Sequence, residues 1–261
     1  YSVLPTDGTG DFTTTRASKK NRVNSELNLE IVDANVPSLN YDSIGGCPVL
    51  NTEPQATNLI TYPISYGNSY WTKSGATVVS GQSAPSVDFP TSAFKLVGDG
   101  LSSFKYLSRF NVPVTDTLTY TLSVFAKAGT LDYIQILLAT GFASNYQNFD
   151  LANGVVGTGA GYISSEIEEY SNGWYKCSVT AVATSTVGTS AYIVLADSAS
   201  MSRAASITTS GDVSLFMAQL ETGSVATSPT FTDTTLAAEG TTQTRTADTA
   251  SGSGNSTVIN S

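Results

Sequence analysis

From about residue 57 onward, short stretches of alternating apolar and polar residues follow one another along the chain. In the clearest stretch, residues 118–127, Leu118, Tyr120 and Leu122 alternate with threonine and serine. A period of two is typical of a β-strand with one buried face. Eight or more such stretches, and no amphipathic helix of about 12 residues with matching caps, predict an all-β fold: a jelly-roll β-sandwich of two antiparallel sheets.

Two of these stretches carry large aromatic residues. In one, Phe104, Tyr106, Ser108 and Phe110 share one face of the expected strand. Trp174 begins the other, directly after an Asn-Gly turn sequence. We expect Trp174 in the core, because an indole ring buries a large area; stacking on a ligand is the alternative.

Composition divides the chain into three parts. Residues 57–235 carry the strand pattern and form the predicted sandwich. Residues 1–56 are rich in turn residues and poor in apolar ones, so we expect an extended N-terminal arm that packs along a neighbouring molecule or another copy of the chain. Residues 236–261 are rich in threonine, serine and glycine and predict a linker toward a further domain. The sequence starts without Met and without a signal-peptide pattern, so we expect a piece of a longer protein.

Charge and hydropathy exclude two classes of partner. The chain has 12 Lys and Arg against 21 Asp and Glu, a formal net charge of −9. A nucleic-acid-binding protein needs a basic face, and the basic residues cluster only at Arg16, Lys19, Lys20 and Arg22. We therefore expect no nucleic-acid partner. No apolar run reaches the roughly 18 residues of a membrane span, so we expect no membrane insertion.

The chain contains no histidine. That excludes Ser-His-Asp and Cys-His catalysis and zinc sites built on histidine. One enzymatic alternative stays open, because a glycosidase needs only two carboxylates about 5 to 10 Å apart. Glu166 and Glu168 would share a strand face at roughly 6 to 7 Å, although the adjacent Glu169 favours a solvated strand edge. We predict that the chain is not an enzyme, and we name no catalytic residue.

The sequence offers few candidates for a metal site or a disulfide, and we expect no cofactor. Asp88, Asp99 and Asp150 could offer loop oxygens to a structural Ca²⁺, but they lack the spacing of a calcium-binding loop. Cys47 and Cys177 lie far apart and lack the spacing of a metal or redox motif. They are either two buried thiols or one disulfide between the arm and a core strand.

One segment is a candidate for stacking on sugar rings. Tyr62, Tyr66, Tyr70 and Trp71 place four large rings within ten residues, in surroundings rich in glycine, asparagine and serine. Rings of this kind offer flat apolar faces, while nearby amides can bind hydroxyl groups. The alternative is that the rings close one end of the sandwich or form a contact between chains.

A second polar-aromatic segment contains Asn145 and Tyr146, followed by Gln147 and Asn148. It is either a binding loop or an ordinary surface loop. The candidate glycan-binding residues are therefore Tyr62, Tyr66, Tyr70, Trp71, Asn145 and Tyr146.

Short motifs run along nearly the whole chain. They are TTTRAS at 13–18, RVNS at 22–25, NVPSLNYD at 35–42, CPVL at 47–50, EPQATNL at 53–59, FDLANG at 149–154, NGWYKCS at 172–178, AQLETGSVATS at 218–228 and TRTAD at 244–248. In this order, the motifs resemble those of bacteriophage tail and fibre proteins.

The resemblance implies a structural protein of a phage tail or head fibre, with a sandwich similar to carbohydrate-binding modules. In such proteins the motif at 244–248 is often followed by a second lectin-like sandwich of the concanavalin type, which is not in this sequence. The resemblance also implies a place on the surface of the extracellular virion, with other virion proteins as partners. Because fibres commonly use cyclic symmetry, we expect a homo-oligomer, preferably a trimer.

Two functions are consistent with this resemblance. In the first, the sandwich binds a glycan on the host surface and serves in attachment. In the second, the chain is an architectural connector that joins virion components without binding a ligand.

Overall fold

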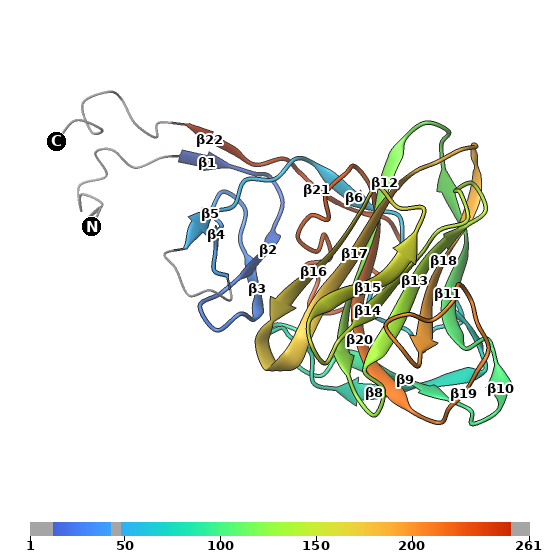
Figure 1. Ribbon diagram of the computed structural model, residues 1–261. Helices are drawn as coiled ribbons and strands as arrows, with labels where there is room; N and C mark the ends of the chain where they lie inside the picture. Colours follow the sequence, from blue (N-terminus) through green and yellow to red (C-terminus); the bar gives the residue numbers. More distant parts are fainter. Residues whose placement is uncertain (1–12, 43–47, 252–261) are drawn as a thin grey trace.

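The computed structural model describes residues 13–42 and 48–251 of the 261-residue chain. Its centre is a sandwich of two six-stranded sheets with antiparallel strand pairs (Figure 1). The first sheet has the order β15-β14-β13-β18-β11-β7, and the second has the order β16-β17-β12-β20-β9-β8. This arrangement confirms the predicted all-β sandwich and is consistent with a jelly roll.

The strands have the following bounds. The first sheet contains β7 (Thr72–Ser74), β11 (Tyr106–Val114), β13 (Tyr133–Ala139), β14 (Tyr146–Asp150), β15 (Val155–Ala160) and β18 (Val187–Ala196). The second contains β8 (Ala76–Gln82), β9 (Ala93–Gly98), β12 (Thr119–Ala128), β16 (Ser164–Tyr170), β17 (Trp174–Val182) and β20 (Asp212–Thr222). The short strands are β1 (Thr13–Thr15), β2 (Lys20–Val23), β3 (Leu29–Val32), β4 (Leu39–Asn40), β5 (Val49–Leu50), β6 (Ala56–Asn58), β10 (Ser102–Ser103), β19 (Ile207–Thr208), β21 (Gln243–Arg245) and β22 (Thr249–Ser251).

Helical structure in the described residues is limited to one 3-10 turn, Ser171–Gly173, which joins β16 to β17. A helix that could span a membrane is not found among them.

The main core lies between the two sheets, where the inward-facing residues of both meet. Leu107 on β11 and Ile193 on β18 are buried opposite each other in the first sheet. Leu122 on β12 and Val179 on β17 are a buried pair in the second. The alternation that predicted strands therefore also fixes which side of each strand enters the core.

A second apolar cluster lies on the outer side of the second sheet. Trp174 is buried there together with Phe125 and Phe216, and its ring contacts the Phe216 ring at a centroid distance of 6.5 Å. Val23 and Leu29 of the N-terminal segment belong to the same cluster. Trp174 is thus a core residue, in a core that the N-terminal segment completes.

The N-terminal segment, called the arm below (described residues up to 56), forms strand pairs with the C-terminal segment. It has partners within its own chain: β1 pairs with β22, and β6 pairs with β21. Few apolar residues are sufficient to dock the arm, because the surface that it covers is already aromatic. Residues 236–251, which belong to the expected linker toward a further domain, supply β21 and β22 to these pairs. Packing of the arm on another copy of the chain stays a prediction.

Candidate functional site

A group of aromatic side chains lies on the outer face of the first sheet, over β11 and β18. We call it the belt, and it consists of Phe104, Tyr106, Phe110 and Tyr192. The register places Ser108 opposite Tyr192 and Leu107 opposite Ile193. Because Leu107 and Ile193 enter the core, Ser108 and Tyr192 point to the other face.

The rings of the belt contact one another, and Tyr192 lies at their centre. Its ring centroid is 5.1 Å from that of Tyr106, 5.7 Å from that of Phe110 and 6.0 Å from that of Phe104. Phe104 and Tyr106 are 4.8 Å apart. All four residues are half-buried, so the rings support one another and still expose part of their surface. Mutual ring contacts of this kind restrict side-chain motion in advance of binding.

Two residues with hydroxyl groups adjoin the belt. Ser108 lies between Tyr106 and Phe110 along β11, and its buried Oγ has no hydrogen-bond partner within the described residues. Thr72 on the edge strand β7 pairs with Ser108 and is exposed. Flat apolar rings next to neutral hydroxyl groups can bind a ligand that has both C–H faces and hydroxyl groups.

A loop at 198–206 lies over the neighbouring part of the same face. Gln135 Nε2 donates to the carbonyls of Met201 and Ser202 at 3.3 and 3.2 Å, and Gln135 Oε1 accepts from Ala204 N at 2.8 Å. Asn148 Nδ2 also donates to Met201 O, at 2.8 Å. Buried amides on β13 and β14 therefore hold the loop in place beside the belt.

The structure corrects the sequence prediction for the segment 62–71, which we call the aromatic segment. Tyr66 is 0% exposed and Trp71 is 2% exposed, and their rings pack edge to face at 5.1 Å. Trp71 Nε1 donates to Tyr62 O at 2.9 Å. A ring without exposed surface cannot stack on a ligand, so the prediction is wrong for Tyr66 and Trp71. They enter the main core instead.

The other two rings of the aromatic segment are half-buried. Tyr62 and Tyr70 lie 5.1 Å apart, and Arg109 Cζ lies 3.9 Å from the centroid of the Tyr70 ring. Tyr70 Oη also accepts a hydrogen bond from Thr61 N at 3.2 Å. These contacts occupy much of the Tyr70 side chain, and a role for Tyr62 and Tyr70 in binding stays a prediction.

The second candidate segment, Asn145 and Tyr146, also combines a buried residue with a half-buried one. Asn145 is 0% exposed, and its Oδ1 accepts from Leu138 N at 3.1 Å. Its carbonyl accepts from Arg203 Nε at 3.1 Å. Asn145 is thus a structural residue, and its predicted place in a binding loop is wrong. Tyr146 is half-buried and keeps its status as a candidate.

The glutamate pair considered for glycosidase chemistry lies on β16, at the edge of the second sheet. Glu166 and Glu168 are both exposed, and they pair with Ser178 and Lys176 of β17. Glu168 Oε2 lies 3.9 Å from Lys176 Nζ. This is the solvated edge that the sequence favoured, and the lack of catalytic activity stays a prediction.

Neither the cysteines nor the loop aspartates form a metal site that the structure shows. Cys177 is a free, buried thiol whose pKa is raised by burial, while Cys47 lies outside the described residues. Asp99 pairs with Lys105, and Asp150 Oδ1 accepts from the backbone N–H groups that follow it in a turn. Among the described residues, no group of three or more acidic or cysteine side chains could hold a metal ion.

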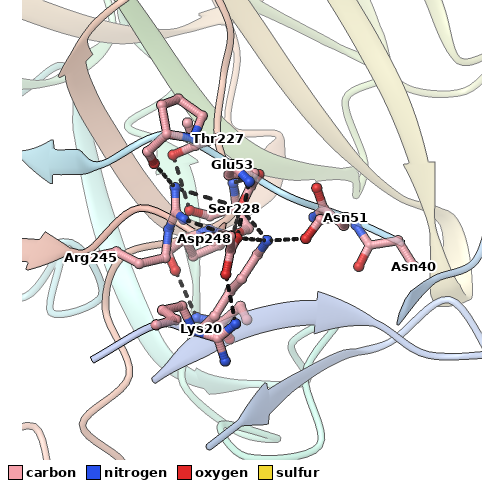
Figure 2. Close-up of polar contacts among 12 residues, drawn as sticks. Lys20, Asn40, Asn51, Glu53, Thr227, Ser228, Arg245 and Asp248 are labelled. Atoms are coloured by element: carbon pink, nitrogen blue, oxygen red, sulfur yellow. Dashed lines mark hydrogen bonds and ion pairs between the residues drawn. The ribbon is translucent and has the colours of Figure 1, made fainter. Parts of the chain in front are cut away.

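Five charged residues form a buried ion network that sequence reasoning missed (Figure 2). Asp248 accepts from Arg16 Nη1 and Lys20 Nζ, each at 2.8 Å. Glu53 Oε2 lies 3.0 Å from Lys20 Nζ and 3.5 Å from Arg245 Nη2. Arg16 and Asp248 are 232 residues apart in sequence. The network therefore joins the arm to the C-terminal segment.

The network lowers the pKa of both of its carboxyl groups. Burial alone would raise the pKa of Glu53, but the charges of Arg245 and Lys20 outweigh that effect. Burial likewise opposes ionisation of Asp248, and hydrogen bonds from Lys20 and Arg16 bring its pKa below the ordinary value. Both carboxylates are thus stabilised in their charged form.

No protein-family model matches the chain, and no curated protein matches it. Among solved structures, the chain is similar to the enzymatically active domain of tailspike protein 4 from bacteriophage CBA120, with 12% identity and a TM-score of 0.40, over 64% of this chain and 21% of that one. It is also similar to the CBM22-1 and GH10 modules of Clostridium thermocellum endo-1,4-β-D-xylanase 10B complexed with xylohexaose, with 10% identity and a TM-score of 0.39, over 67% of this chain and 30% of that one.

A third similar structure comes from carbohydrate-binding modules of the β-sandwich superfamily. The identity is 10% and the TM-score 0.37, over 81% of this chain and 92% of that one. The chain spans less than a third of the tailspike domain and of the xylanase modules. Because the identities and TM-scores are low throughout, we base the functional proposal on the residues of this chain.

Proposed function

We propose that the chain is a glycan-binding module of a phage virion and that the belt is its binding surface. The observation that carries the proposal is the set of four mutually contacting, half-buried rings on the outer face of the first sheet. Beside them lies Thr72 on the edge strand β7, an exposed residue with a neutral hydroxyl group that pairs with Ser108. A neutral sugar satisfies both features, because its C–H face packs on a ring while its hydroxyl groups bind neighbouring polar atoms.

The chemistry of the belt favours neutral glycans. The belt consists of phenylalanine and tyrosine side chains, so stacking and hydroxyl hydrogen bonds supply the affinity. Screening by salt weakens interactions between exposed charges, and it has little to act on here. Binding should therefore change little between low and physiological ionic strength.

The place on the virion is supported by the phage-fibre motifs and by the course of the chain. β1 and β22 pair at one end of the molecule, whereas β11 and β18 lie at the opposite end (Figure 1). Attachment to other virion proteins through the paired strands would leave the belt free for the host surface. We propose a homotrimer for this assembly, with the sandwiches facing outward.

A glycan array tests the proposal with two matched variants. The wild-type protein should bind at least one neutral glycan, Tyr192→Ala should lose that signal, and Tyr62→Ala should keep it. Tyr62 is the control because it is also a half-buried tyrosine but lies outside the belt. If the wild-type protein binds no glycan on the array, the glycan proposal fails and the connector function takes its place.

A further inference from the structure

A concave feature lies between the arm and the edge of the second sheet. It is a cleft of about 130 Å³. The arm contributes Asn21, Asn51 and Glu53 to its lining, and the sandwich contributes Glu168, Lys176 and Ser228. Asn51, Glu53 and Ser228 lie together in Figure 2. The cleft exists only because the arm is docked on the sandwich.

The lining offers hydrogen-bond acceptors and donors side by side. Asn21 is 0% exposed; its Nδ2 donates to the carbonyls of Pro229 and Phe231, each at 2.9 Å. Its Oδ1 has no partner within the described residues. A buried acceptor without a partner is costly. The half-buried amide residues Asn40 and Asn51, which also line the cleft, are the ones that a ligand can reach.

Charge in the cleft is balanced. Lys176 Nζ donates to the carbonyls of Ala226 and Thr227 at 3.0 and 3.1 Å, and Arg22 pairs with Glu30. Glu53 is held by Lys20 and by Ser228, whose Oγ donates to it at 2.6 Å. A strongly charged ligand would have to break these pairs. A neutral ligand whose groups both donate and accept can bind without doing so.

The size of the cleft limits the ligand further. Pockets for drug-sized molecules are about 300 to 1,000 Å³, so a cleft of about 130 Å³ suits one small unit rather than a chain. Val23, Leu29 and Ala226 add apolar wall to the polar lining. Hydroxyl groups on a compact carbon frame match this combination.

We infer that the cleft binds a single neutral sugar unit, at a site separate from the belt. The ligand contacts the arm and the sandwich at once, so binding stabilises the docked arm by mass action. This inference goes beyond the proposed function and does not depend on the belt.

The experiment uses four neutral sugars as probes: glucose, galactose, mannose and N-acetylglucosamine. Binding is measured by titration with ligand-observed NMR, and arm docking is measured by amide hydrogen exchange of residues 20–32. At least one sugar should bind saturably to the wild-type protein and slow exchange in that range. The inference is overturned if none of the four does so.

Two matched pairs of variants locate the site. Ala226→Leu fills the cleft and should abolish sugar binding, while Val225→Leu, at a neighbouring position that is 68% exposed, should not. Glu168→Gln removes a charged acceptor from the lining and should weaken binding by at least about tenfold. Glu166→Gln, two residues away on β16 and outside the lining, should bind like wild type.

The outcomes separate this site from the belt. Each titration is repeated in the Tyr192→Ala background, where the belt has lost its central ring and the single sugar should still bind saturably. Loss in Tyr192→Ala with normal binding in Ala226→Leu would place the sugar on the belt, which overturns the cleft and supports the proposed function. If Ala226→Leu does not fold, Glu168→Gln and Glu166→Gln are compared instead. Equal sugar affinity in these two variants overturns the inference.

Discussion

The belt and the aromatic segment each contain four large rings, yet the fold uses them in opposite ways. Tyr106 and Phe110 of the belt lie on β11, Phe104 lies two residues before that strand, and Tyr192 lies on the neighbouring β18, so the rings gather on one outer face. The aromatic segment connects β6 to β7 and has no period of two. Its chain turns back on itself, and Tyr66 and Trp71 enter the core. The comparison teaches that density of aromatic residues does not predict exposure, whereas strand register does.

The largest effect that separates the two regions is on stability. Trp71→Ala should lower the free energy of unfolding by about 3 to 5 kcal/mol, because it leaves a cavity in the main core. Tyr192→Ala removes a half-buried ring and should cost about 1 kcal/mol. Denaturant unfolding of both variants measures the difference. Equal losses in the two variants would remove the distinction between core ring and surface ring.

The response to acid is the next contrast. Trp71 lies in the main core and Trp174 in the cluster that the arm covers, so each fluorescent residue reports on a different core. Glu53 and Asp248 have lowered pKa values in the folded protein, so their contribution to stability is present above their unfolded pKa values of about 4. It is lost as the pH falls through the folded values. Acid should therefore release the arm and change the fluorescence of Trp174, which the arm covers, before that of Trp71.

The variants Trp71→Phe and Trp174→Phe leave one fluorescent reporter each for this titration. Asp248→Asn should mimic acid at neutral pH and cost about 3 kcal/mol in arm docking, because Arg16 and Lys20 keep buried charges without their carboxylate. If both tryptophans respond at the same pH, the arm does not release separately and this part of the account is wrong.

The smallest effect concerns the rings of the aromatic segment that stay half-buried. Arg109 lies over the Tyr70 ring at 3.9 Å, and such contacts contribute about 0.5 to 1 kcal/mol at exposed sites. Arg109→Ala should lower the melting temperature slightly, and Arg109→Lys should restore part of the loss. No change with Arg109→Ala would show that the contact does not stabilise Tyr70.

Much of the fold could be predicted because a period of two identifies strands locally. The shared face of Phe104, Tyr106, Ser108 and Phe110 was visible for the same reason, and three of these residues are belt rings. Tyr192 could not be added, because its place beside them depends on the pairing of β11 with β18, about 80 residues further along the chain. No local rule specifies a register across that distance.

The ion network shows the same limit more strongly. Arg16 and Lys20 were recognised as part of a basic cluster, and Asp248 as part of a motif. The contacting residues are more than 200 positions apart in sequence. Considered alone, each of them is predicted to be a solvated surface charge. Burial by the arm, which itself depends on the aromatic surface around Trp174, is what turns them into a network.

The most direct test of the account is the affinity of three proteins for one glycan. The glycan with the strongest array signal is titrated against wild type, Tyr192→Ala and Tyr62→Ala, each checked for a normal melting transition. Loss of one stacking ring should cost about 1 to 3 kcal/mol of binding free energy, a rise of roughly 5- to 150-fold in Kd for Tyr192→Ala. Tyr62→Ala should bind like wild type. Wild-type affinity in Tyr192→Ala together with a loss in Tyr62→Ala would contradict the account and move the site to the aromatic segment.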